Sequence, residues 1–161
     1  MGTERGYGAM EYIQVKGCDK PVSRLVKGTD YFFHDRYEKA AANLDAFLSI
    51  GGNALDTAHI YCGGQSEEVI GRYMKERGNR DRLVILTKGA HHDQNGPRVH
   101  PEAIASDLSQ SLQRLGTDYI DMYALHRDDP ATPAGVIVEA LNEHIRAGSI
   151  GAIGVSNWTW Q

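Results

Sequence analysis

The 161-residue sequence is ordinary for a globular protein, with 41% apolar and 24% charged residues, and it is long enough to bury one hydrophobic core. Its net charge of −4 is spread without long blocks of one sign, which argues against nucleic acid or an anionic membrane as partner. No apolar run approaches the roughly 18 residues of a membrane span, and the first ten residues lack a signal-peptide core. The two cysteines make no disulfide framework. We expect one cytoplasmic domain with small-molecule partners.

The N-terminal third predicts a cap, a strand and a helix. Residues 1–10 are polar and glycine-rich, and we expect a flexible lead-in. Apolar segments on both sides of the turn-forming stretch 16–21 predict a hairpin, or a small cap, followed by a first strand at about 24–27. Apolar residues at helical spacing then predict a helix over 35–50, which Gly51 and Gly52 end.

Strands and helices alternate through the rest of the chain. Predicted strands end at Asp56, Lys88, His126 and Ser156, and the successive ends lie 32, 38 and 30 residues apart, about one βα unit each. Between them, helical spacing predicts helices over about 65–77, 101–115 and 133–146, which Gly78, Gly116 and Gly148 end. Ile145 is among the inward positions of the last helix.

The start of the helix at residue 65 carries a hydroxyl and two acids, at Ser66, Glu67 and Glu68. Capping and the helix dipole favour such residues in a first turn. We therefore interpret them as a helix-start signal.

This alternation predicts an α/β fold with a parallel sheet and right-handed crossovers, either doubly wound or closed into a barrel. Polar residues at four consecutive strand ends favour the barrel, in which catalytic groups come from several strand ends on one face. Five strands are present, whereas a complete barrel has eight in about 250 residues. We predict a partial TIM-type (β/α) barrel with an N-terminal hairpin cap, formed by residues 11–161 and truncated after the fifth strand.

The polar strand ends suit proton donation to a carbonyl oxygen. A tyrosine hydroxyl normally titrates near pH 10 and becomes a useful acid when a cation stabilises the phenolate. Lys88 is placed to supply that cation for Tyr61, with Asp56 holding the ammonium and His126 orienting the carbonyl. The hydride must come from a cofactor, whose carboxamide the hydroxyl and amide of Ser156-Asn157 are suited to bind.

Taken singly, each residue has a plainer explanation. Asp56 could be a turn residue, Tyr61 a packing aromatic and Lys88 a solvated strand end, but four polar residues in register weaken these explanations. The histidines of loop 91–100 invite a metal site; their irregular spacing favours instead a polar loop beside the substrate, and we expect no metal. Cys62 is expected to be a small packed thiol.

The same segments, in this order and at this spacing, resemble the aldo-keto reductases. The segments are Leu55-Asp56-Thr57-Ala58 followed by Tyr61, Leu86-Thr87-Lys88, Leu125-His126 and Ile153-Gly154-Val155-Ser156-Asn157. The resemblance implies reduction of an aldehyde or ketone with NADPH, the choice over NADH staying open, and a hairpin that plugs the barrel bottom. It implies catalytic roles for Asp56, Tyr61, Lys88 and His126, and cofactor binding by Gly28, Thr29, Asp56, Ser156 and Asn157.

The family's last three strands, which hold the ring-stacking aromatic and the phosphate-binding loops, have no counterpart in this sequence. We therefore expect the chain to be inactive alone and, because five strands leave two open edges, to associate or to bind cofactor weakly. The alternative is a non-catalytic cofactor-binding or regulatory subunit on the same scaffold.

Overall fold

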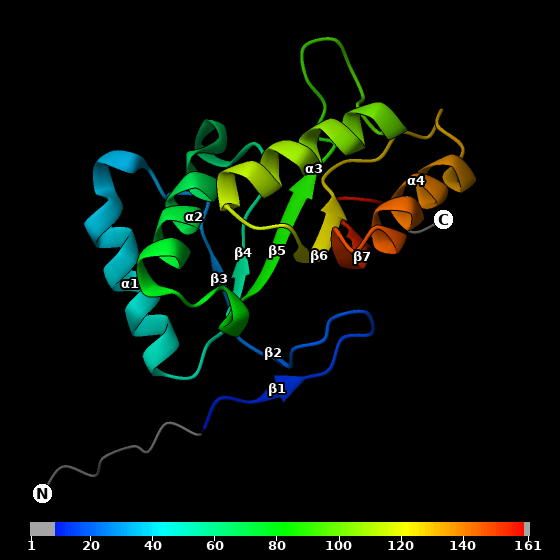
Figure 1. The fold of residues 1–161 in the computed structure, drawn as a ribbon. Coiled ribbons are helices and arrows are strands. Elements are labelled where there is room, and N and C mark those ends of the chain that lie inside the picture. Colours follow the sequence, from blue (N-terminus) through cyan, green and yellow to red (C-terminus); the bar gives the residue numbers. More distant parts are fainter. Residues whose placement is uncertain (1–8, 160–161) are drawn as a thin grey trace, which may run out of the picture.

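The computed structural model describes residues 9–159, so residues 1–8 of the predicted lead-in lie outside it. Its centre is a parallel sheet of five strands paired in chain order (Figure 1). The strands are β3 (Val26–Gly28), β4 (Ala54–Asp56), β5 (Val84–Gly89), β6 (Ile120–Leu125) and β7 (Ile150–Val155). The predicted parallel α/β architecture is confirmed. The strands form part of a barrel that is not closed within the described residues.

Four helices connect these strands and lie along the sheet (Figure 1). They are α1 (Tyr37–Ser49), α2 (Gln65–Arg77), α3 (Pro101–Leu115) and α4 (Ala134–Arg146). Short 3₁₀ turns precede α1, α2 and β5, as η1 (His34–Arg36), η2 (Tyr61–Gly64) and η3 (Arg80–Arg82). None of the helices in residues 9–159 is long and apolar enough to span a membrane.

The helix boundaries follow the predicted start and stop signals closely. The third predicted helix is found with the same ends, and α2 and α3 end at Gly78 and Gly116 with φ of 57° and 63°. Those left-handed backbone angles cost glycine least. One inward prediction was wrong: Ile145 is 37% exposed, because the buried stripe of α4 is Ile137, Ala140 and Leu141.

The predicted hairpin forms from β1 (Tyr12–Ile13) and β2 (Val22–Ser23) and lies beneath the N-terminal ends of the sheet (Figure 1). Its turn is held by a buried carboxylate: Asp121 on β6 pairs with Lys20 at 2.7 Å and with Arg80 at 2.9 Å. Asp121 also accepts the backbone N–H of Ile85 at 2.9 Å. This end of the sheet is therefore closed by matched charges and hydrogen bonds.

The two outer strands of the sheet carry exposed apolar side chains. Val26 on β3 is 47% exposed, and Ile153 and Val155 on β7 are 40% and 57% exposed. Within residues 9–159 each of these strands pairs on one side only. The sheet thus presents apolar surface where further strands of a barrel would lie.

We predict that Gly71→Ala destabilises the chain by about 1–3 kcal/mol through overpacking. Gly71 lies in the middle of α2, and a Cβ there would stand 2.2 Å from the backbone oxygen of Arg114 on α3. The control is Gly135→Ala on α4, where a Cβ meets nothing within 4 Å. The free energies of unfolding of both variants are measured with urea. Equal values would show that the α2–α3 contact accommodates the added methyl group without loss of stability.

Candidate active site

The four predicted catalytic residues converge at the C-terminal ends of three neighbouring strands. Asp56 is the last residue of β4, Lys88 is the penultimate residue of β5, and His126 follows β6 directly. Tyr61 opens η2, on the loop that leaves β4. Parallel pairing brings these strand ends to one edge of the sheet, so residues far apart in the chain meet there.

The centre of the group is the ammonium of Lys88, whose side chain is only 8% exposed. It pairs with the carboxylate of Asp56, donates to the Thr57 carbonyl at 2.8 Å and donates to the Tyr61 hydroxyl oxygen at 3.2 Å. An ammonium has three N–H donors, and all three have acceptors here. Because the Tyr61 oxygen accepts from Lys88, its own O–H remains free to donate.

His126 lies next to Tyr61, with the two ring centroids 5.8 Å apart in an edge-to-face arrangement. Burial, reinforced by the positive charge of Lys88, lowers the pKa of His126 to about 4. The ring is therefore neutral near pH 7, with one nitrogen a donor and the other an acceptor. Its Nδ1 is buried and has no hydrogen-bond partner among the described residues.

The loop that carries Tyr61 is tied to β5 through its backbone. The N–H of Thr57 donates to Leu86 at 2.9 Å, and the N–H of His59 donates to the carbonyl of Lys88 at 2.8 Å. Cys62 then takes a left-handed φ of 53°, and its thiol donates to the Asp30 carbonyl at 3.1 Å. Burial raises the pKa of this thiol, which keeps it protonated and packed.

Among the predicted cofactor residues, Ser156 and Asn157 lie beside His126. The N–H of Ser156 donates to Leu125 at 2.9 Å and extends the β6–β7 pairing. The side-chain amide of Asn157, whose φ is 59°, donates to the His126 carbonyl at 3.1 Å. The hydroxyl of one residue and the amide of the other therefore lie at the same edge as the tetrad.

The two remaining cofactor candidates differ in accessibility. Gly28 is exposed and pairs with Asp56 across β3 and β4. Thr29 is fully buried, and its hydroxyl donates to the carbonyl of Asp56 at 2.9 Å. The side chain of Thr29 thus supports the end of β4, whereas Gly28, which has no side chain, leaves the surface beside it accessible.

The predicted start of α2 is confirmed, because the helix begins at Gln65 and has Glu67 and Glu68 in its first turn. The N-cap is Gly64, which has no side chain to cap the helix. The side chains of Ser66 and Glu67 have a further role that the sequence did not indicate. Both side chains are fully buried beneath the site, where Ser66 donates to the Thr29 carbonyl at 2.9 Å. Their partners lie between 9 and 47 residues away in the chain, beyond the reach of a helix-start pattern, so no local signal marks them.

The histidine loop after β5 contributes a neighbour to the tetrad. The ring of His91 lies edge-to-face on His126, with centroids 4.9 Å apart, and is tilted by 40° against the ring of His92, with centroids 4.3 Å apart. Across residues 9–159 no group of three or more histidine, cysteine or acidic side chains is arranged to hold a metal ion.

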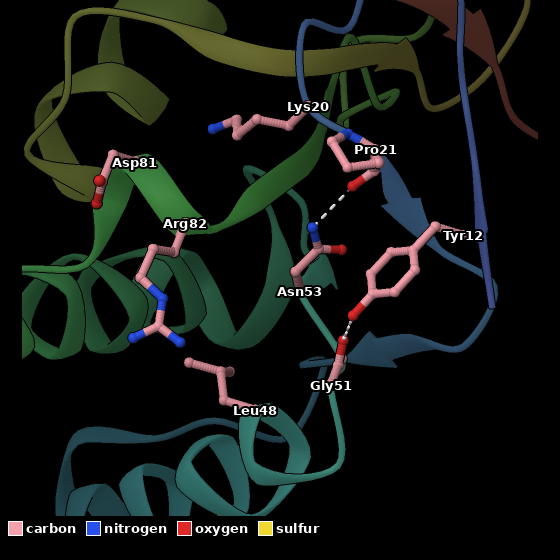
Figure 2. A pocket seen from close by; sticks show the side chains of 9 residues that line it. Tyr12, Lys20, Pro21, Leu48, Gly51, Asn53, Asp81 and Arg82 are labelled. Atoms are coloured by element: carbon pink, nitrogen blue, oxygen red, sulfur yellow. Dashed lines mark hydrogen bonds between the residues drawn. The ribbon is translucent and has the colours of Figure 1, made fainter. Parts of the chain in front are cut away.

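A pocket of about 400 Å³ lies at the other end of the sheet, between the hairpin, the end of α1 and η3 (Figure 2). Figure 2 shows two hydrogen bonds between residues of the pocket, and both hold the hairpin in place. The Tyr12 hydroxyl donates to Gly51 at 2.6 Å, and the Asn53 amide donates to Pro21 at 2.8 Å. This pocket is remote from the tetrad and does not contribute to it.

Comparison with known proteins gives a consistent result. The model of the Aldo/keto reductase family matches residues 24–161. Aldo-keto reductase YhdN of Bacillus subtilis is 36% identical over 158 residues, covering 93% of this chain and 48% of YhdN. Norsolorinic acid reductase stcV of Emericella nidulans is 36% identical over 129 residues, covering 74% of this chain and 33% of stcV.

Among solved structures, the holo form of aldo-keto reductase AKR11C1 from Bacillus halodurans superposes with a TM-score of 0.80 at 34% identity. The match covers 91% of this chain and 50% of that one. The chain thus spans about half the length of YhdN and of this structure, and a third of stcV.

The pKa of His126 makes a testable prediction about stability. The unfolded chain binds a proton at this residue near pH 6.5, whereas the folded chain does so only near pH 4. Above pH 6.5 the imidazole is neutral in both states and protonation does not affect folding. As the pH falls from 6.5 toward 4, only the unfolded chain takes up the proton, so the free energy of unfolding decreases. Urea unfolding across this range should show a steeper loss for the native chain than for His126→Gln, and parallel curves would contradict the burial of a neutral imidazole.

Proposed function

Because the chain belongs to the aldo/keto reductase family, we propose that it carries the catalytic residues for NADPH-dependent reduction of an aldehyde or ketone to an alcohol. Residues 11–161 would form the N-terminal hairpin and the first five strands of the barrel, with the four helices that connect these strands. The observation that carries the proposal is the hydrogen bond from Lys88 to the Tyr61 oxygen, at 3.2 Å.

In this proposal Tyr61 is the proton donor. Its oxygen accepts from Lys88, so its hydrogen can pass to a carbonyl oxygen held in front of it. The phenolate left behind is stabilised by the ammonium of Lys88, while the carboxylate of Asp56 keeps that ammonium charged and in place. A proton from water then restores the hydroxyl.

His126 orients the carbonyl rather than protonating it. An imidazole that takes up a proton only near pH 4 is neutral at physiological pH, and its N–H is a donor for the substrate oxygen. Two donors, Tyr61 and His126, then meet one oxygen and hold it where negative charge develops.

The cofactor would be held by residues on the same edge. The nicotinamide supplies, when bound, the hydride that reaches the carbonyl carbon. Its carboxamide needs both a donor and an acceptor, which the Ser156 hydroxyl and the Asn157 amide provide beside His126. On the other side of the tetrad from Ser156 and Asn157, Gly28 and Asp56 lie at the ends of β3 and β4. The buried Thr29 donates to the Asp56 carbonyl. We propose NADPH on the strength of the family resemblance.

Tyr61→Phe should lower kcat by roughly 10²–10⁴, the usual contribution of a positioned acid, while leaving the Kd for NADPH unchanged. The measurement is NADPH consumption with a panel of aldehydes. It is made on the chain alone and on the chain joined to the part of YhdN that it does not match. We expect turnover only in the joined barrel.

The control for this substitution is Tyr119→Phe. The Tyr119 hydroxyl also accepts from a lysine, Lys20, at 3.2 Å, but Tyr119 directly precedes β6 and so lies at the opposite end of the sheet from the tetrad. Full turnover by Tyr61→Phe would reject Tyr61 as the acid. Binding of NADPH by the joined barrel without any turnover would instead indicate a non-catalytic subunit.

A further inference from the structure

A buried carboxylate on α2 reaches the strand that carries Lys88. The side chain of Glu67 has no exposed surface. One of its oxygens accepts the hydroxyl hydrogen of Thr87, the residue before Lys88, at 2.7 Å. The other lies 3.3 Å from Nη1 of Arg114. A single carboxylate thus joins the end of β5 to the last turn of α3.

The guanidinium of Arg114 in turn holds the loop that carries Tyr61. Its Nη1 donates to the carbonyl of His59 at 2.8 Å, two residues before Tyr61. The loop also lies directly on the guanidinium at Gly64, where φ is 95° and a Cβ would stand 2.6 Å from the Arg114 Cζ. A larger residue at Gly64 would push the loop away.

We propose that the Glu67–Arg114 ion pair is a positioning element that sets Tyr61 against Lys88. The pair acts on both partners of that hydrogen bond: Glu67 holds the Lys88 side through Thr87, and Arg114 holds the Tyr61 side through His59. The consequence for turnover rests on the proposed function, whereas the consequence for the loop does not.

Stability alone is a poor explanation for this pair. Removing two charges from water costs several kcal/mol per ion, and well-packed apolar replacements of buried pairs are often neutral or stabilising. Arg114 is 21% exposed and Glu67 is fully buried, so the pair carries that cost. What an apolar replacement would not supply is the donor for the His59 carbonyl and the acceptor for the Thr87 hydroxyl.

The test is the double substitution Glu67→Gln/Arg114→Met, which removes both charges and leaves neither unpaired. The matched control is Glu139→Gln/Arg146→Met, which removes the exposed α4 pair, whose atoms lie 2.6 Å apart. In the chain itself, we expect the amide hydrogen of His59 to exchange at least about tenfold faster in the test variant than in the control.

Turnover of the joined barrel supplies a readout that a purely structural role would not move. We expect kcat to fall by roughly 10²-fold, the typical effect of a misplacement of about 1 Å, with KM for the aldehyde and the melting temperature close to those of the control. Exchange and kcat equal to the control would overturn the proposal.

Arg114→Lys keeps the proposal testable if the double variant fails to fold. A lysine retains the charge for Glu67 but lacks the fork that reaches Glu67 and the His59 carbonyl together. Fast exchange at His59 with a native fold is the expected result, and native exchange would overturn the proposal. If the unsubstituted joined barrel shows no turnover, the proposed function fails while the exchange rates still decide the positioning role.

Discussion

The pairing of β4 with β5 aligns Asp56 with Leu86, and the pairing of β5 with β6 aligns Gly89 with Leu125. This parallel register places a carboxylate, an ammonium and an imidazole at one edge of the sheet. A slip of one residue would turn every side chain of a strand to the opposite face. The candidate site therefore depends on the same backbone hydrogen bonds that build the sheet.

A charge at this edge needs partners, because an unpaired buried ion is expensive. The ammonium of Lys88 has such partners near the core, because a carboxylate, a carbonyl and a hydroxyl accept its three hydrogens. The same charge, added to burial, keeps His126 neutral. In the proposed mechanism, this one cation gives its two neighbours different roles: Tyr61 is an acid whose phenolate the cation stabilises, and His126 is a neutral donor.

The two ends of the sheet differ in how their polar groups are used. At the N-terminal end, Asp121 is matched by Lys20, Arg80 and a backbone N–H. At the C-terminal end, His126 Nδ1 and Trp158 Nε1 are buried without partners in the part of the chain that the structure describes. In barrel enzymes the active site lies at the C-terminal edge, while the opposite face serves stability.

The sequence by itself determined the order of strands and helices, the glycine stops at Gly78 and Gly116, and the four polar strand ends, because periodicity and backbone preference are local properties. It also indicated, through spacing alone, that these ends share one edge. Only the tertiary structure decided that Glu67, in the first turn of α2, is also a buried anchor, and that Ile145 faces outward. Those outcomes depend on which distant side chains meet: Glu67 faces Arg114, 47 residues further along the chain, and no local pattern records that contact.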